Sequence, residues 1–130
     1  MSGFVHAKLF AKRGIGSVAQ WVRPEAPNSG VRCLVYHSVV AGGRDDAAQM
    51  TISRRLFEEQ MAFLSVNGYH VEDAARVVER WRRREPLPPR TVVLTFDDGF
   101  ASLAEDVLPV LQRYRFPATL FLITAALEGE

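Results

Sequence analysis

The sequence predicts an α/β fold with a mainly parallel sheet that is covered by helices. From residue 31 onward, strand-like apolar runs alternate with segments of helical periodicity. The runs VRCLVYH, TVVLTF and FPATLFLI lack the polar alternation of a half-exposed strand, which is typical of strands covered on both faces. Strands separated by helices are joined by right-handed crossovers and therefore run parallel. With 48% hydrophobic and 24% charged residues, the 130-residue chain has room for one core.

Residues 1–30 are expected to form an irregular lead-in, because VRPEAPNSG at its end combines two prolines with Asn, Ser and Gly. The apolar stretches before it are too short for a signal-peptide core or a membrane span. We therefore expect a soluble chain that is cytoplasmic as written, with its cellular location otherwise open. A formal net charge of +1 gives no reason to expect nucleic acid or an anionic membrane as a partner.

The first strand is predicted at 31–37 and ends at His37. The next stretch, VVAGGRDDAAQMTI, contains two glycines and is interpreted as a long loop. The helix that follows reads RRLFEEQMAFLSVN and is expected to be capped by Ser53. Its apolar residues Phe57, Met61 and Leu64 share one face.

A short strand at 69–71 and a second helix come next. The helical segment EDAARVVERWRRRE begins with acidic residues and ends with arginines, the order that a helix macrodipole favours. The run WRRR also allows a nucleic-acid interpretation, but a solvated helix end is preferred. The prolines of PLPP end this helix.

The strand 91–96 is followed by DDGF and by the helical pattern SLAEDVLPVLQRY. Ser102 and Glu105 are expected to form a capping box at the start of this third helix. Pro109 is expected to bend it. The last apolar run is predicted to be another buried strand, at 118–123.

The residues that indicate chemistry stand at strand ends. Parallel sheets place their chemistry at the carboxyl ends of their strands, where His37, Asp97 and Asp98 fall. Two adjacent carboxylates can coexist there if a cation neutralises one of them, and Gly99 allows a tight turn. Two other interpretations stay open. Asp-Gly is a common turn dipeptide, and aspartyl-phosphate phosphatases use a strand-end carboxylate, although the adjacent pair fits them less well.

Several of these segments together resemble a known family. TFDDGF, the helix with VLPVL, and FPATLFL are similar to the start of a polysaccharide deacetylase domain. YHSV and LFEEQMAFL, which precede them, make the chain most similar to the poly-N-acetylglucosamine deacetylase branch. The resemblance covers residues 31–127. It implies a partial (β/α) barrel, with 31–130 as the N-terminal part of the domain and a truncation after the strand near 118–123.

The resemblance also implies roles for the strand-end residues. Asp97 would be the general base and Asp98 a ligand of a divalent metal, most naturally zinc. His37 would protonate the leaving amine, unless it is only a rim histidine satisfied by local hydrogen bonds. The implied substrate is an N-acetylated amino-sugar polymer. His70 is expected to be structural, and His6 lies in the lead-in.

The chain departs from the family pattern at one point. The resemblance implies two further histidine ligands from an H-x-x-x-H-like motif beyond FPATLFL, yet no histidine follows His70. Asp98 alone cannot make a tight zinc site. Two hypotheses therefore remain: the N-terminal half of a metal-dependent deacetylase, or an inactive remnant that at most binds carbohydrate.

Overall fold

The computed structural model of the chain describes residues 30–42, 50–99 and 101–124. All but the last residue of the expected lead-in lies outside these ranges. None of the described helices has the length and apolar character that a membrane crossing requires.

The centre of the fold is a parallel sheet built around β5 (Thr91–Phe96). One edge of β5 pairs with the whole length of β1 (Arg32–Tyr36). The other edge pairs first with β4 (His70–Val71) and then, nearer its carboxyl end, with β6 (Thr119–Leu120). All of these pairings are parallel, which confirms the predicted α/β arrangement. The described residues form an open sheet and no closed barrel.

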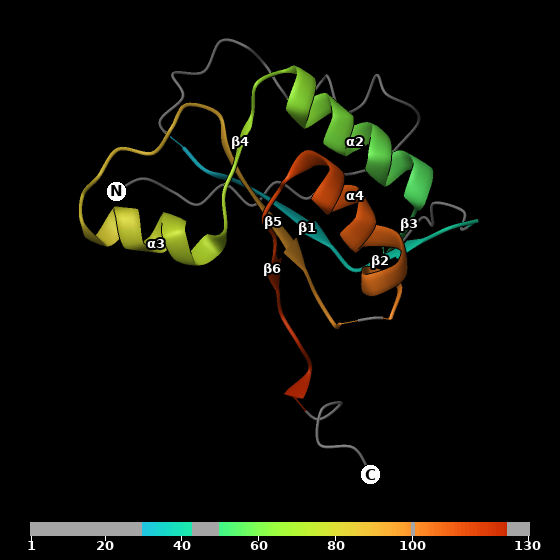
Figure 1. Cartoon of the computed structure of the whole chain (residues 1–130). Coiled ribbons are helices and arrows are strands. Elements are labelled where there is room, and N and C mark those ends of the chain that lie inside the picture. Colours follow the sequence, from blue (N-terminus) through green and yellow to red (C-terminus); the bar gives the residue numbers. More distant parts are fainter. Residues whose placement is uncertain (1–29, 43–49, 100, 125–130) are drawn as a thin grey trace.

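The helices lie between the strands in the chain, as a right-handed crossover fold requires. They are α2 (Arg54–Val66), α3 (Ala74–Arg82) and α4 (Leu108–Tyr114). A π-helical turn, η1 (Leu103–Val107), leads directly into α4. Figure 1 shows α2 and α4 side by side over the sheet, with α3 set apart from them.

The core lies between the sheet and the pair formed by α2 and α4. The face of α2 predicted from the sequence, with Phe57, Met61 and Leu64, is buried as expected. The Tyr36 ring stacks on Phe96 with ring centroids 5.2 Å apart, and Phe57 meets Tyr36 edge-on. The other core residues come from both layers: Val39, Ile52, Tyr69, Val71, Val92, Leu94, Val107, Val110 and Leu111.

The start of α2 is formed as the sequence predicts. The Ser53 hydroxyl accepts a hydrogen bond from the Leu56 amide at 3.2 Å, which satisfies one of the unpaired donors of the first turn. Gly68 follows the helix with φ 66°, a conformation that costs glycine little. In α3 the Asp73 side chain caps in the same way, accepting from the Arg76 amide at 2.8 Å.

The long loop expected after the first strand is only partly a loop. It contains β2 (Ser38–Val40) and β3 (Thr51–Ser53), which form a second, two-stranded parallel sheet. Val39 and Ile52 are buried in the core, so burial of one residue from each short strand stabilises the pairing. The glycines and polar residues that suggested a loop fall mainly at 43–49, outside the described residues.

The predicted capping box is wrong. Ser102 already has helical dihedral angles (φ −57°, ψ −18°) and makes no capping hydrogen bond, because the segment opens as the π-helical turn η1. Pro109 lies in the first turn of α4, directly after the π-helical turn η1, so the helix changes type just before the proline.

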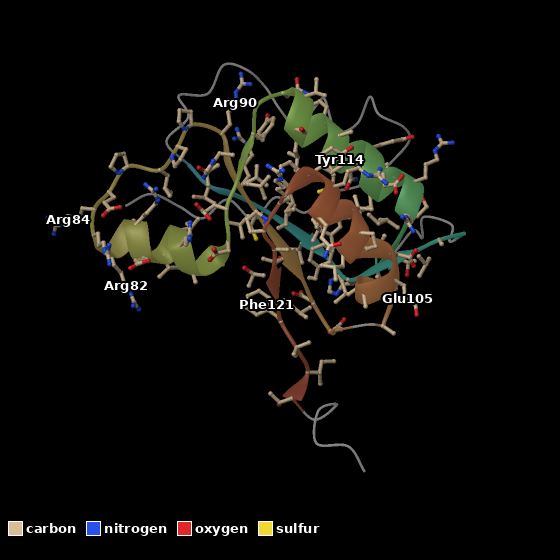
Figure 2. The ribbon with its side chains drawn as sticks, viewed as in Figure 1. Arg82, Arg84, Arg90, Glu105, Tyr114 and Phe121 are labelled. Carbon is tan, nitrogen blue, oxygen red and sulfur yellow. The ribbon has the colours of Figure 1, made fainter. Side chains whose placement is uncertain are left out.

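The last predicted strand is shorter and more exposed than expected. Only Thr119–Leu120 pairs as β6, and the side chains that follow are not buried. Leu120, Phe121, Leu122 and Ile123 are 47%, 55%, 46% and 51% exposed. Figure 2 shows Phe121 at the margin of the molecule, away from α2. An apolar strand is buried only where other elements cover it, and about half of each of these four side chains is left uncovered.

Candidate functional site

The two longest strands, β1 and β5, bring the predicted site residues to one edge of the sheet. Their register pairs Tyr36 with Phe96, so both strands end at the same level. The Asp97 amide extends the ladder by donating to the Tyr36 carbonyl at 2.9 Å. His37 and Asp97, the next residue of each strand, therefore stand at the same sheet edge. The expectation that His37 shares a rim with the two aspartates is confirmed.

His37 and Asp98 are in direct contact. The distance from His37 Nδ1 to Asp98 Oδ2 is 3.2 Å, and the two side chains are 27% and 31% exposed. An ionised carboxylate only accepts hydrogen bonds, so when Asp98 is ionised the proton of this bond lies on Nδ1. The second ring nitrogen, Nε2, is then left to face another group. The catalytic and metal-binding roles of these residues stay predictions.

Residues 97–99 form a tight turn, which we call the strand-end turn. Asp98 and Gly99 both have positive φ angles, 72° and 73°, and the Gly99 amide donates to the Asp97 carbonyl at 3.0 Å. Aspartate tolerates this left-handed region better than most residues with a side chain, and glycine occupies it freely. The turn itself directs Asp98 to His37. An Asp-Gly turn and a carboxylate site at the strand end are therefore not mutually exclusive interpretations.

A buried hydrogen bond supports the end of β1. Tyr36, the residue before His37, donates its hydroxyl to Gln60 Oε1 at 2.8 Å. Burial raises the pKa of Tyr36 above its usual value, because water no longer solvates the phenolate. The sequence interpretation missed Gln60. Its signal was a single amide within the apolar face of α2, beside Phe57 and Met61.

A second polar contact joins the start of α2 to η1. Arg54 Nη1 lies 3.6 Å from Asp106 Oδ1, and Asp106 is only 8% exposed. The sequence interpretation missed this pair as well. Asp106 stands in the apolar stripe that includes Leu103, Val107 and Val110, and a carboxylate at such a position indicates a charged partner nearby.

A further histidine and carboxylate meet away from the strand ends. His70 Nε2 lies 3.4 Å from Glu72 Oε2. His70 pairs with Thr91, at the start of β5, whereas the strand-end turn follows the other end of the same strand. This placement agrees with the expectation that His70 is structural.

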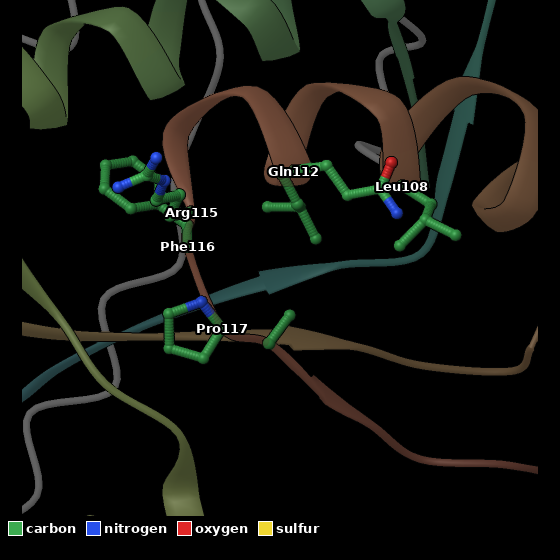
Figure 3. A pocket seen from close by; sticks show the side chains of 7 residues that line it. Leu108, Gln112, Arg115, Phe116 and Pro117 are labelled. Carbon is green, nitrogen blue, oxygen red and sulfur yellow. The ribbon is translucent and has the colours of Figure 1, made fainter.

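The molecule also has an apolar pocket that contains none of the predicted site residues. Leu108, Gln112 and Arg115 line it from α4 and its end, and Pro117 lines it from the connection to β6 (Figure 3). Its volume is about 570 Å³. With Arg115 as its one charged lining residue, the pocket offers no carboxylate or imidazole for acid–base chemistry.

Comparison with known proteins agrees with this geometry. The sequence pattern of the polysaccharide deacetylase family matches residues 84–130, which include β5 and the strand-end turn. The chain is 38% identical over 95 residues to the poly-beta-1,6-N-acetyl-D-glucosamine N-deacetylase of Escherichia coli strain K12. It superimposes on a solved de-N-acetylase from Aggregatibacter actinomycetemcomitans with a TM-score of 0.67 and 31% identity. The chain belongs to the polysaccharide deacetylase family.

The chain covers only part of these deacetylases. The match to the Escherichia coli enzyme includes 71% of this chain and 14% of that protein. The superposition on the Aggregatibacter structure includes 77% of this chain and 40% of the other. A second solved structure, IcaB from Ammonifex degensii, gives a TM-score of 0.62 at 31% identity, over 72% of this chain and 38% of that one.

Polysaccharide deacetylases are typically metal-dependent, and a zinc ion must be held by several donor side chains. Catalytic zinc sites use three protein ligands. Within residues 30–42, 50–99 and 101–124, no three His, Cys, Asp or Glu side chains gather closely enough to hold a metal ion. Asp98 and His37 supply two donors that are in contact with each other. The described residues therefore do not fit a complete zinc site.

Proposed function

We propose that this chain provides part of the active site of an enzyme that removes acetyl groups from an N-acetylated amino-sugar polymer. Asp97 is the general base, His37 is the general acid and Asp98 is one ligand of a divalent metal whose other ligands lie outside the described residues. The observation that carries the proposal is the 3.2 Å contact between His37 and Asp98 at the edge where β1 and β5 end. The family membership of the chain supports it.

Hydrolysis of an acetamide requires two proton transfers that these side chains can supply. A base removes a proton from the attacking water, and an acid delivers a proton to the nitrogen as its bond to the acetyl carbon breaks. The products are acetate and a free amine. His37 contacts Asp98 and not Asp97. The Asp97 carboxylate is therefore available to a water molecule. His37 holds Asp98 through Nδ1 and has Nε2 for the departing nitrogen.

The test is acetate release from N-acetylglucosamine oligomers at increasing zinc concentrations. It uses the 130-residue chain and the longest chain that its gene encodes. Because Asp98 lacks a complete ligand set among the described residues, the 130-residue chain is expected to bind zinc weakly and release acetate negligibly. Strong zinc-dependent release by the short chain would show that the ligand assignment is wrong.

Variants of an active longer chain separate the roles. Asp97→Asn is expected to lower turnover by a factor of about 10² to 10⁴ while zinc stays bound, because the base is lost and the ligand is kept. Asp98→Asn should weaken zinc binding and turnover together. Full turnover in Asp97→Asn would refute the base assignment.

His37 has a matched control within the chain. His37→Gln should lower turnover and leave zinc affinity nearly unchanged, since it removes the acid. His70→Gln also breaks a histidine–carboxylate contact, but far from the strand-end turn, and should leave turnover unchanged. Equal effects of the two substitutions would remove His37 as the acid without affecting the aspartates.

A further inference from the structure

The segment after β6 runs past the end of β5 and reaches the strand-end turn. Thr119 and Leu120 pair with Thr95 and Phe96, and the Phe121 amide donates to the Phe96 carbonyl at 2.8 Å. This last hydrogen bond fixes the course of the chain where β5 gives way to the turn. The next residue is Leu122.

The Leu122 side chain packs directly against Gly99. A Cβ atom placed on residue 99 would lie 2.6 Å from Leu122 Cδ2, closer than two carbon atoms can approach without displacement. The leucine methyl group therefore fills the space that any side chain at position 99 would need. Gly99 is favoured by its φ of 73°, and a side chain at this position would also require the end of the Leu122 side chain to move.

The strand-end turn needs support because Asp98 has a positive φ of 72°, which carries some strain even for aspartate, although aspartate tolerates it better than most residues. On the β1 side, the bond from the Asp97 amide to Tyr36 holds the turn. On the β6 side, Leu122 packs on Gly99. Leu122 is 46% exposed, so about half of this large side chain is covered.

We propose that Leu122 is a positioning residue that holds the strand-end turn and so keeps Asp98 in contact with His37. The contact of Leu122 with Gly99 limits the space in which the turn can move, and the left-handed backbone of Asp98 is retained because the turn cannot relax toward β6. The consequence for turnover rests on the function proposed above for Asp97 and Asp98. The consequence for the backbone does not.

Amide hydrogen exchange, measured by NMR on the 130-residue chain, tests the backbone consequence. Leu122→Ala should speed exchange of the Asp97 and Gly99 amides by about tenfold, because the turn opens more often. The Leu94 amide in the middle of β5 should exchange at its original rate. Unchanged exchange at Asp97 and Gly99 would overturn the proposal, and so would an equal increase at Leu94, since Leu122 would then act on global stability.

Leu120 is the matched control. It is the same residue type in the same segment and is exposed to nearly the same extent, 47% against 46% for Leu122, but its backbone pairs with Phe96 rather than reaching the turn. Leu120→Ala should leave the Asp97 and Gly99 amides unchanged. Leu122→Met, which keeps most of the side-chain volume, should restore slow exchange. Faster exchange of the Asp97 and Gly99 amides in both Leu120→Ala and Leu122→Met would contradict a specific role for Leu122.

A double-mutant cycle with Gly99→Ala gives a second measurement. The added methyl group in Gly99→Ala collides with Leu122, so removing the leucine side chain should relieve part of the disturbance. Leu122→Ala is therefore expected to slow exchange of the Asp97 amide in the Gly99→Ala background, the reverse of its effect in the wild type. Additive effects would refute direct packing.

Turnover separates this proposal from the proposed function. In a longer chain that releases acetate, Leu122→Ala should lower kcat more than it raises KM, because it disturbs groups that act on the amide bond rather than groups that bind sugar. If no wild-type chain releases acetate but exchange responds as expected, the proposed function fails and the positioning role stands. If wild-type chains release acetate but exchange does not respond, the positioning role fails alone.

Discussion

The strands β5 and β6 start from similar apolar sequences and end in different environments. All six residues of β5 are buried, whereas the segment from Leu120 to Ile123 is exposed by about half. β5 has a neighbour on each edge and the helix pair α2 and α4 over one face. β6 pairs with β5 on one edge and for two residues only. An apolar composition shows what a segment can bury, and its neighbours decide whether it does.

The difference extends to the strand-end turn. The turn directly follows the buried strand β5. The hydrogen bond from the Asp97 amide to the Tyr36 carbonyl extends the pairing of β5 with β1 up to the turn. The segment after β6 contributes the packing of Leu122 on Gly99. The turn therefore lies between a stable element and a weakly held one. The predictions that follow test this contrast, beginning with the largest effect.

Leu94→Ala should produce the largest loss of stability. Leu94 is 0% exposed at the centre of β5, so its truncation leaves a cavity and is expected to lower the free energy of unfolding by about 2–5 kcal/mol. Leu120→Ala in β6, with a side chain that is about half exposed, should cost less than about 1 kcal/mol. Urea denaturation followed by circular dichroism measures both. Equal costs would break the contrast between the two strands.

The burial of Tyr36 beside β5 predicts a loss of stability in alkaline solution. Burial raises the pKa of Tyr36, which stacks on Phe96, above the value near 10 of an unfolded chain. The stabilising effect of the protonated phenol is complete below pH 10 and is lost as the pH rises, because the unfolded state ionises first. The slope approaches about 1.4 kcal/mol per pH unit.

Tyr36→Phe is the control for that slope. It should reduce the dependence of unfolding free energy on pH above 10, while costing about 1–2 kcal/mol at pH 7 because Gln60 Oε1 loses its donor. Urea denaturation between pH 7 and 11 gives both quantities. An unchanged slope in Tyr36→Phe would mean that another group causes the alkaline loss.

Thr119→Val sharpens the account of how β6 is held. The Thr119 hydroxyl accepts a hydrogen bond from the Ala74 amide, at the start of α3, at 3.1 Å. Its loss is expected to lower the free energy of unfolding by about 1 kcal/mol, the typical net value of one hydrogen bond. Thermal unfolding of Thr119→Val and Thr119→Ser gives the comparison, since serine keeps the acceptor. A loss in Thr119→Ser as large as that in Thr119→Val would rule out the hydrogen bond as the cause.

Phe121→Ser should have the smallest effect on stability. The phenylalanine side chain is 55% exposed, and its replacement is expected to change the free energy of unfolding by less than about 0.5 kcal/mol. Self-association should decrease, because an exposed apolar edge promotes contact between chains. Analytical ultracentrifugation measures that decrease. A large loss of stability would show that the segment after β6 is covered in solution.

Local patterns in the sequence were sufficient for the elements that depend on near neighbours. The Ser53 cap and the apolar face of α2 each depend on residues within a few positions, and both were predicted correctly. The parallel order of the strands followed from their alternation with helices. The capping box at Ser102 failed because a π-helical turn, which packs against β2 and meets Arg54 at the start of α2, replaced an ordinary helix start.

Of the candidate site, the sequence by itself determined the residue types, the strand-end positions of His37, Asp97 and Asp98, and a tight turn that Gly99 allows. Only the tertiary structure decided that β1 and β5 end in register, which places His37 Nδ1 3.2 Å from Asp98 Oδ2. It also decided that Leu122 packs on the turn and that the last apolar segment stays exposed. The physical reason is range: propensity and periodicity act over one or two turns of chain, whereas His37 and Asp98 are 61 positions apart and meet only through strand pairing.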